Sequence, residues 1–279
     1  MNFENKKVAV VTKHEKEKLI APILEANFKM ESVLIPNLDT DIWGTFSGEK
    51  ERLGTAIETV INKTKMISEL QDFDFVIASE GSFFEHPFLP FTTVNEEVVC
   101  LRSLEEDRMF IGKAQSVVSN FKKGVFSQYE DLLQFARKVN FPSHALILKD
   151  KNEEGNSVFK ALRNEKHLKL IFDFLKELNE EVYVETDMRA HLNPTRQLVI
   201  QEAVNNLVAR MKSVCPKCKT PDFWVDHLKY DLNCMVCDAP TSLASAEVLH
   251  CKSCAYEEEK KIVITDEDLI QAACERCNP

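Results

Sequence analysis

The sequence is poor in the residues that dominate fibrous, linker and low-complexity proteins. Among 279 residues there are 7 glycines and 10 prolines, so collagen-like and linker-rich classes are excluded. No apolar run approaches the ~18–20 residues that cross a bilayer, and no long apolar stretch precedes a small-residue cleavage site near the N-terminus. We therefore expect a cytoplasmic globular protein with no membrane partner.

A concentration of positive charge is also lacking. Lysine and arginine total 35 against 45 aspartates and glutamates, a formal net charge of −10. Proteins that neutralise nucleic-acid phosphates gather Lys and Arg on one surface, whereas the basic residues here are interleaved with acidic ones. Nucleic acid is therefore not an expected partner. A small anionic or phosphate-bearing ligand remains compatible with this composition, because a few cations in one cleft are enough to bind it.

Cysteine, in contrast, is concentrated at the end of the chain. Eight of the nine cysteines form four Cys-x-x-Cys pairs: Cys215/Cys218, Cys234/Cys237, Cys251/Cys254 and Cys274/Cys277. Two thiolates on one tight turn reach one tetrahedral metal, and two such turns complete a four-sulfur site. The four pairs therefore predict two structural zinc ions. A thioredoxin-like redox pair or an iron–sulfur cluster is the alternative, and each favours other spacings.

The spacing leaves the connectivity of the four pairs open. The segment 234–262 reads as a knuckle, a strand, a second knuckle and a return strand, which favours joining Cys234/Cys237 to Cys251/Cys254. Cys215/Cys218 would then join Cys274/Cys277. A sequential pairing, first with second and third with fourth, is the alternative.

The surroundings of these cysteines bear on their role. A site filled by four sulfurs leaves no position for a catalytic water, and the neighbouring runs 257–259 and 266–268 are acidic. Zinc ribbons that bind nucleic acid surround the metal with Lys and Arg. We therefore expect structural zinc sites whose acidic surface is available to a protein partner. The remaining cysteine, Cys100, lies in an apolar strand and is expected to act as a small buried hydrophobe.

Residues 1–212 show alternating strand and helix patterns. Apolar runs predict strands near 8–11, 31–36, 72–79, 95–103, 108–117, 143–149 and 181–185. Helical periodicity is found near 19–28, 49–70, 129–139, 167–178 and 195–211. This alternation predicts an α/β domain with a mixed sheet in three layers. It is followed, at 213–279, by a small zinc-ribbon-like module.

Polar residues accumulate at the ends of these elements, where α/β proteins bind ligands. Thr12, His14 and Lys16 lie between the first strand and helix, a position suited to a phosphate. An exposed, charged first helical turn is the alternative interpretation. Asp39 and Asp41 are further candidates for the site. The alternative interpretation is that they belong to an ordinary loop that caps the following helix.

The end of the strand at 72–79 is a further candidate. It is expected to deliver Glu80 and Gly81 into a loop with Ser82. A carboxylate at that position suits Mg²⁺ or general-base work.

A last polar cluster precedes the final helix. Its members are Asp187, Arg189, His191, Asn193 and Arg196. Asn193 followed by proline is a sound helix start, but capping does not require two arginines and a histidine. The segment is a candidate to line a ligand site.

Several blocks of sequence carry a resemblance. They resemble the signature blocks of a family of uncharacterised bacterial proteins with a cysteine-rich tail. The blocks are DTDIWGTFSGEKER, ASEGSFFEHPFLPF, ETDMRAHLNPTR, CPKCKTPDFW and CERCNP. The resemblance spans nearly the whole chain and implies two domains. It implies no activity.

The large domain is also similar, in its order of parts, to the inosine-triphosphate pyrophosphatase superfamily. That resemblance implies phosphate binding by Thr12 and Lys16, and nucleobase contact by His191 with Arg196. It further implies Mg²⁺ held by Glu80 with an aspartate, Asp39 or Asp41, for hydrolysis of a nucleotide or another phosphate compound. His14 stands where that superfamily usually has asparagine. A non-enzymatic ligand-binding or adaptor protein is the competing hypothesis.

Overall fold

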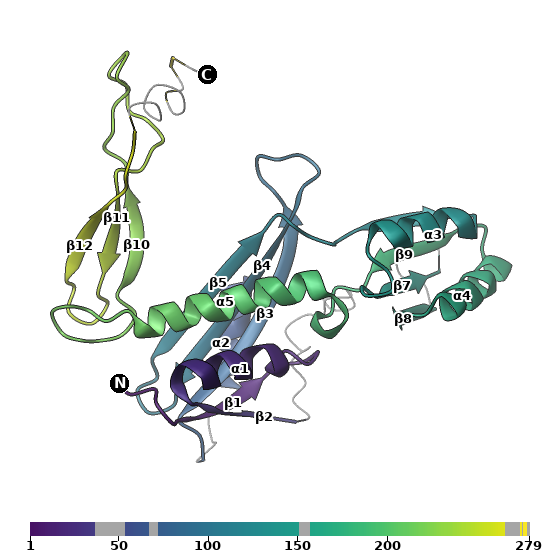
Figure 1. Cartoon of the computed structure of the whole chain (residues 1–279), viewed down its shortest axis with the longest axis horizontal. Helices are drawn as coiled ribbons and strands as arrows, with labels where there is room; N and C mark the ends of the chain where they lie inside the picture. Colours follow the sequence, from purple (N-terminus) through teal and green to yellow (C-terminus); the bar gives the residue numbers. More distant parts are fainter. Residues whose placement is uncertain (37–53, 67–71, 151–156, 266–273, 275, 278–279) are drawn as a thin grey trace. The chain divides into compact units, whose positions relative to one another are not determined.

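The computed structural model describes residues 1–36, 54–66, 72–150, 157–265, 274 and 276–277 (Figure 1). The chain divides into two compact units, residues 2–208 and residues 209–279 together with Met1. The division falls inside α5 (Pro194–Lys212), and the boundary expected at 212/213 lies at the end of the same helix.

The first unit is built around a five-stranded sheet in the order β2-β1-β3-β4-β5. Its strands are β1 (Lys7–Val11), β2 (Glu31–Leu34), β3 (Phe75–Glu85), β4 (Thr93–Ser103) and β5 (Met109–Ser116). β1 pairs in parallel with β2 and β3, whereas β4 pairs antiparallel with β3 and β5. The predicted α/β class with a mixed sheet is therefore confirmed.

Helices cover both faces of this sheet, because successive residues of a strand point to opposite sides. On one face Ala9 and Val11 pack in a core cluster with Val60 of α2 (Ala56–Lys65). On the other, Phe3 contacts Phe75 of β3 and Phe28 of α1 (Glu17–Phe28).

The helix α5 approaches the same face as α1. A Cβ on Gly112 of β5 would lie 2.3 Å from the carbonyl oxygen of Ala203 and 2.6 Å from Leu207. Only glycine allows this approach of helix to strand. The two helix layers and the sheet between them make the three-layer arrangement.

β3 is longer than its sequence pattern indicated. Its pairing with β4 continues without a break from Phe75↔Ser103 to Glu85↔Thr93. Glu80, Gly81 and Ser82, expected in a loop, therefore lie inside the strand. Apolar patterning missed this extension because the buried ladder continues through polar residues.

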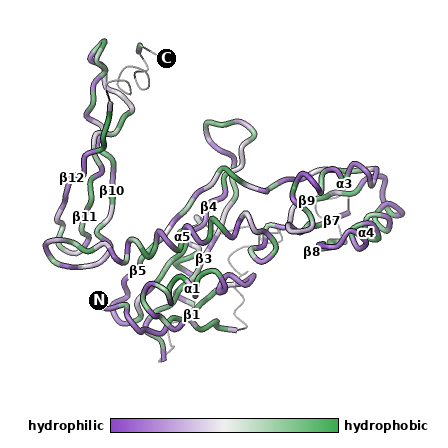
Figure 2. Tube along the Cα trace, viewed as in Figure 1, coloured by the Kyte–Doolittle hydropathy of each residue, from purple (hydrophilic) through white to green (hydrophobic). Residues whose placement is uncertain are grey.

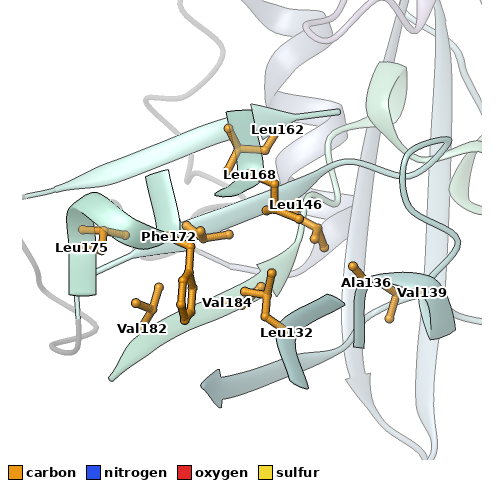
Figure 3. Close-up of a cluster of buried hydrophobic side chains, with 11 residues drawn as sticks. Leu132, Ala136, Val139, Leu146, Leu162, Leu168, Phe172, Leu175, Val182 and Val184 are labelled. Atoms are coloured by element: carbon orange, nitrogen blue, oxygen red, sulfur yellow. The ribbon is translucent and has the colours of Figure 1, made fainter. Parts of the chain in front are cut away.

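A second sheet in the same unit was not predicted. It is antiparallel, in the order β6-β9-β7-β8, with β6 (Lys123–Phe126), β7 (Leu146–Lys149), β8 (Val158–Leu162) and β9 (Val182–Thr186). It shares a hydrophobic core with α3 (Tyr129–Lys138) and α4 (Glu165–Leu178), whose members include Leu132, Phe172 and Val184 (Figure 3). Hydrophobic and hydrophilic residues alternate along both helices, as in amphipathic helices (Figure 2).

The second unit contains a three-stranded antiparallel meander. Its strands are β10 (Trp224–Lys229), β11 (Ala246–His250) and β12 (Glu257–Lys261), with β11 in the centre. The four Cys-x-x-Cys turns lie before, between and after these strands. No described helix of the chain is both long enough and apolar enough to span a membrane.

Candidate metal centres and candidate ligand site

The eight paired cysteines gather into two four-sulfur groups. Cys215 and Cys218 meet Cys251 and Cys254, and Cys234 and Cys237 meet Cys274 and Cys277, with the ligand atoms of each group within 4.8 Å of one another. Individual Sγ–Sγ separations are 3.5 Å for Cys218–Cys251 and 3.7 Å for Cys215–Cys254. A tetrahedral zinc with Zn–S bonds of ~2.3 Å requires sulfurs ~3.8 Å apart. The two groups could therefore hold two zinc ions.

The pairing is interleaved, first turn with third and second with fourth. Both pairings considered from the sequence are therefore wrong. The register of the meander supplies the reason: Trp224 at the start of β10 lies opposite His250 at the end of β11. The first turn precedes Trp224 and the third follows His250, so they meet at one end of the sheet.

The same logic places the other two turns at the opposite end. Lys229 at the end of β10 lies opposite Ala246, and Ala246 lies opposite Lys261 at the end of β12. The second turn follows β10 and the fourth follows β12. Since a five-residue strand is roughly 16 Å long, the two centres are separated by the length of the sheet.

Each group would form a closed site. Four thiolates would complete the coordination of zinc and leave no open position for water. Cys100 takes no part: it is completely buried on β4, and burial raises the pKa of its thiol to about 12. Its thiol is therefore un-ionised and packs as a small apolar side chain.

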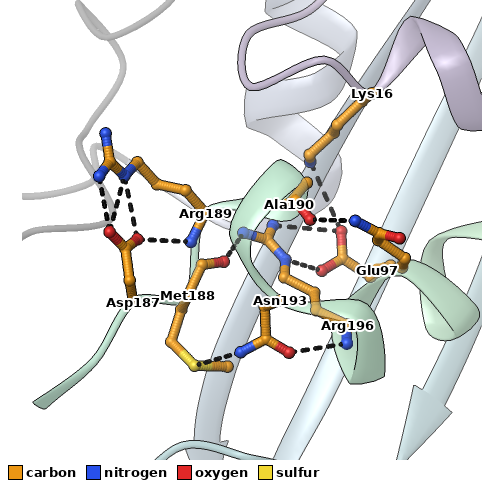
Figure 4. Close-up of polar contacts among 9 residues, drawn as sticks. Lys16, Glu97, Asp187, Met188, Arg189, Ala190, Asn193 and Arg196 are labelled. Carbon is orange, nitrogen blue, oxygen red and sulfur yellow. Dashed lines mark hydrogen bonds and ion pairs between the residues drawn. The ribbon is translucent and has the colours of Figure 1, made fainter. Parts of the chain in front are cut away.

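The first unit holds a buried ionic cluster on the sheet face shared by α1 and α5 (Figure 4). Glu97 of β4 is 1% exposed. Its carboxylate accepts hydrogen bonds from Arg196, the third residue of α5, with donor–acceptor distances of 2.6 Å from Nε and 3.4 Å from Nη2. Lys16, which precedes α1, directs its Nζ to the same carboxylate at 3.5 Å. One carboxylate thus serves two buried cations.

Gly81 makes room for this pair. It lies opposite Glu97 in the ladder, and a Cβ at Gly81 would lie 2.4 Å from both Arg196 Nη2 and Glu97 Oε1. The guanidinium also lies 5.7 Å from the ring centroid of Phe83 and donates from Nη1 to the carbonyl oxygen of Met188. The absence of a side chain at Gly81 therefore leaves room for the guanidinium against the strand, where these contacts fix its position.

Two histidines lie beside the cluster. The rings of His14 and His191 are stacked, with centroids 5.7 Å apart. Burial, followed by the charges of Lys16 and Arg189, lowers the pKa of His14 to about 4. His14 is therefore a neutral imidazole at physiological pH. It has a φ of 64°, in the left-handed region that few residues adopt outside functional sites and turns.

Lys16 is also perturbed. Burial lowers its pKa to about 8, and Arg196 lowers it further while Glu97 opposes the shift. The ammonium is therefore present at pH 7 and titrates in a range where few lysines do.

The remaining polar residues before α5 have local partners. Asp187 is fully buried, and its carboxylate accepts hydrogen bonds from Arg189 Nη2 at 2.6 Å and from the backbone N–H of Ala161 at 3.2 Å. Asn193 Oδ1 accepts the backbone N–H of Arg196 at 3.0 Å, as expected of a helix cap. These contacts hold the segment in shape.

Glu80 is directed away from the Glu97 carboxylate, although its charge still acts on Lys16. It is one residue from Gly81 on a regular strand and therefore points to the opposite face, where Lys63 of α2 contacts it at 2.5 Å. Ser82 shares that face by the same alternation, and Thr12 Oγ1 donates to the adjacent Lys13 carbonyl at 3.2 Å. Asp39 and Asp41 lie outside the described residues. Among the residues described, the two cysteine groups are the sets suited to a metal, and Glu80 belongs to neither.

Sequence analysis missed Glu97 and Lys63, the partners on the two faces. A usable signal existed for Glu97, because it adjoins the apolar run Val98–Leu101 in one strand. A charge within a strand buried on both faces requires a partner.

No curated protein matches significantly. Among solved structures, a chain of a PelC dodecamer from Paraburkholderia phytofirmans superposes with a TM-score of 0.22 and 11% identity, over 43% of this chain and 78% of that one. A score this low does not indicate a shared fold.

A family model matches residues 63–279, a segment that contains both cysteine groups, Glu97 and Arg196, whereas His14 and Lys16 precede it. Its description is Domain of unknown function (DUF6671). The chain belongs to this uncharacterised family.

Proposed function

We propose that the first unit binds a small anionic ligand on the face shared by α1 and α5, and that the second unit is a structural zinc module. The observation that carries the proposal is Lys16. Its side chain is 5% exposed, and its ion-pair partner among the described residues, Glu97, is already held by Arg196.

An anion beside Lys16 would remove an electrostatic imbalance. Charges buried in a low-dielectric interior are costly unless they are matched. An incoming anion would match the second cation, and the N-terminus of α1 at that position adds partial positive charge.

This binding is testable with sulfate, whose charge does not change between pH 6.5 and 9.5. Lys16→Met is expected to weaken sulfate binding by about 10- to 100-fold, since a charge-assisted contact contributes roughly 1.5–3 kcal/mol. Lys18→Met is the matched control: it lies two residues further along, in the first turn of α1, but is exposed and paired with Glu15. Equal affinities in both variants, measured by calorimetry, would contradict the proposal.

The pH dependence follows from the pKa of Lys16, which is about 8 in the free protein. A bound anion raises this pKa, so binding takes up a proton above pH 8. Sulfate affinity is therefore expected to be constant below pH 7 and to fall above pH 8, by up to about tenfold per unit. The same titration on Lys16→Met should be flat. A flat profile in the unmodified protein would remove Lys16 from the site.

The zinc module could also bind a protein partner. β12 is an edge strand whose residues Glu257–Lys261 are all exposed. Docking of a protein partner on this acidic surface is compatible with the fold and is kept as a prediction.

Hydrolysis of a phosphate compound, which the pyrophosphatase resemblance implies, has weaker support. Glu80, the expected metal ligand or base, is paired with Lys63 on the face opposite Lys16. We therefore favour binding over a hydrolysis centred on Glu80. Mg²⁺-dependent phosphate release from nucleoside triphosphates that disappears in Glu80→Gln would reverse that preference.

A further inference from the structure

Buried polar atoms without a partner lie on the same face as Lys16. Across the described residues, five buried side-chain atoms have no hydrogen-bond partner, and they include Ser79 Oγ, Asn95 Oδ1 and His191 Nδ1. Ser79 and Asn95 are 3% and 2% exposed. Leaving such a group unsatisfied costs about 1–3 kcal/mol, so three of them in one region require an explanation.

The register of β3 and β4 relates these atoms to the ionic cluster. Ser79, Gly81 and Phe83 alternate along β3 on one face, opposite Val99, Glu97 and Asn95 of β4. Residues two apart on an antiparallel strand are separated by about 6.8 Å. Ser79 and Asn95 therefore flank the Arg196–Glu97 pair on either side, roughly 14 Å apart along the strands.

Their chemistry specifies what such a molecule must offer. Asn95 Oδ1 is an acceptor only, so its partner must carry an O–H or N–H group. Ser79 Oγ can donate or accept. His191 lies against His14, a neutral imidazole at physiological pH that can also accept a hydrogen bond.

We infer that the ligand is an anionic polyol, an extended compound with one acidic group and several hydroxyls. The inference rests on the proposed anion binding: Lys16 takes the acidic group, and Ser79 and Asn95 take hydroxyls. Phosphate and carboxylate are two forms of the same acidic chemistry.

The experiment compares four probes at pH 7 by calorimetry: inorganic phosphate, ribose 5-phosphate, acetate and gluconate. Within the preferred head group, the polyol is expected to bind at least 10-fold more tightly than the bare anion. Ser79→Ala and Asn95→Leu should each reduce that gain by about 10-fold while leaving phosphate or acetate affinity unchanged. Neither variant loses a hydrogen bond made within the protein, so both should remain as stable as the original.

Thr59→Val is the matched control. Thr59 Oγ1 is also buried without a partner, but it belongs to α2 on the opposite face, so its loss should change no affinity. Binding of neither bare anion would overturn the proposed function itself. Binding of a bare anion with no gain from the polyol, or with a gain that Ser79→Ala and Asn95→Leu do not alter, would overturn the polyol inference and leave anion binding intact.

Discussion

A protein in which Cys215 and Cys251 are both changed to serine is expected to retain one zinc ion per chain, against two in the unmodified protein. Both residues belong to one centre in the interleaved arrangement, so Cys234, Cys237, Cys274 and Cys277 stay intact. Zinc content should be measured by atomic spectroscopy after dialysis against a chelator too weak to remove metal from the unmodified protein.

The comparison variant changes Cys215 and Cys234, which belong to different centres. It is expected to lose both ions, because each centre then has three thiolates. A sequential pairing predicts the opposite results for the two variants. The other pairing considered from the sequence predicts that both variants lose both ions. Retention of one ion by Cys215→Ser/Cys251→Ser is therefore the decisive outcome, and Cys100→Ala should keep two.

Loss of metal should also unfold the second unit. Structural zinc contributes about 10–16 kcal/mol of apparent binding free energy in small domains. The described strands of this unit are short, and β12 is fully exposed. Chelation of both ions is therefore expected to abolish the protection of the backbone amides of β10, β11 and β12 against hydrogen exchange.

The second large effect is expected from Glu97→Gln. This change removes the carboxylate that both Arg196 and Lys16 contact, and removing one partner of a buried pair costs about 3–5 kcal/mol. Urea unfolding followed by circular dichroism should show the loss. The adjacent Glu96→Gln is the control, since Glu96 is partly exposed and hydrogen-bonds Gln115; its effect should stay within about 0.5 kcal/mol.

A double variant separates charge from packing. Adding Lys16→Met to Glu97→Gln removes one of the two cations that contact Glu97 in the unmodified protein. Part of the lost free energy of unfolding should therefore return. If the two changes simply add, the coupling between Lys16 and Glu97 is absent, and the proposed anion site loses its electrostatic basis.

The sequence predicted correctly those features that depend only on residues close together in the chain. The eight cysteines that could bind metal were identified because Cys-x-x-Cys places two sulfurs on one turn, whatever the rest of the chain does. The mixed α/β class followed from hydrophobic periodicity. Asn193 and Pro194 marked the start of α5 for the same local reason.

Grouping across the chain could not be read in the same way. Glu80 was expected to join Lys16 and His191 in one site, but a single step along a strand reverses the direction of a side chain. Because β3 continues through Glu80 and Gly81, Gly81 lies against Arg196 whereas Glu80 meets Lys63. Glu97 was overlooked because its partners, Lys16 and Arg196, are distant from it in the sequence.

The sequence by itself determined that this chain has an α/β unit, a cysteine-rich module that could hold two zinc ions, and a set of polar residues at strand and helix ends. The tertiary structure alone decided which turns share a metal centre, which cations share Glu97, and which face each polar residue occupies. Spacing determines what two neighbours can bind, because a turn has one geometry. Strand register and direction determine what distant residues can bind together, and both depend on pairings between segments that no local pattern specifies.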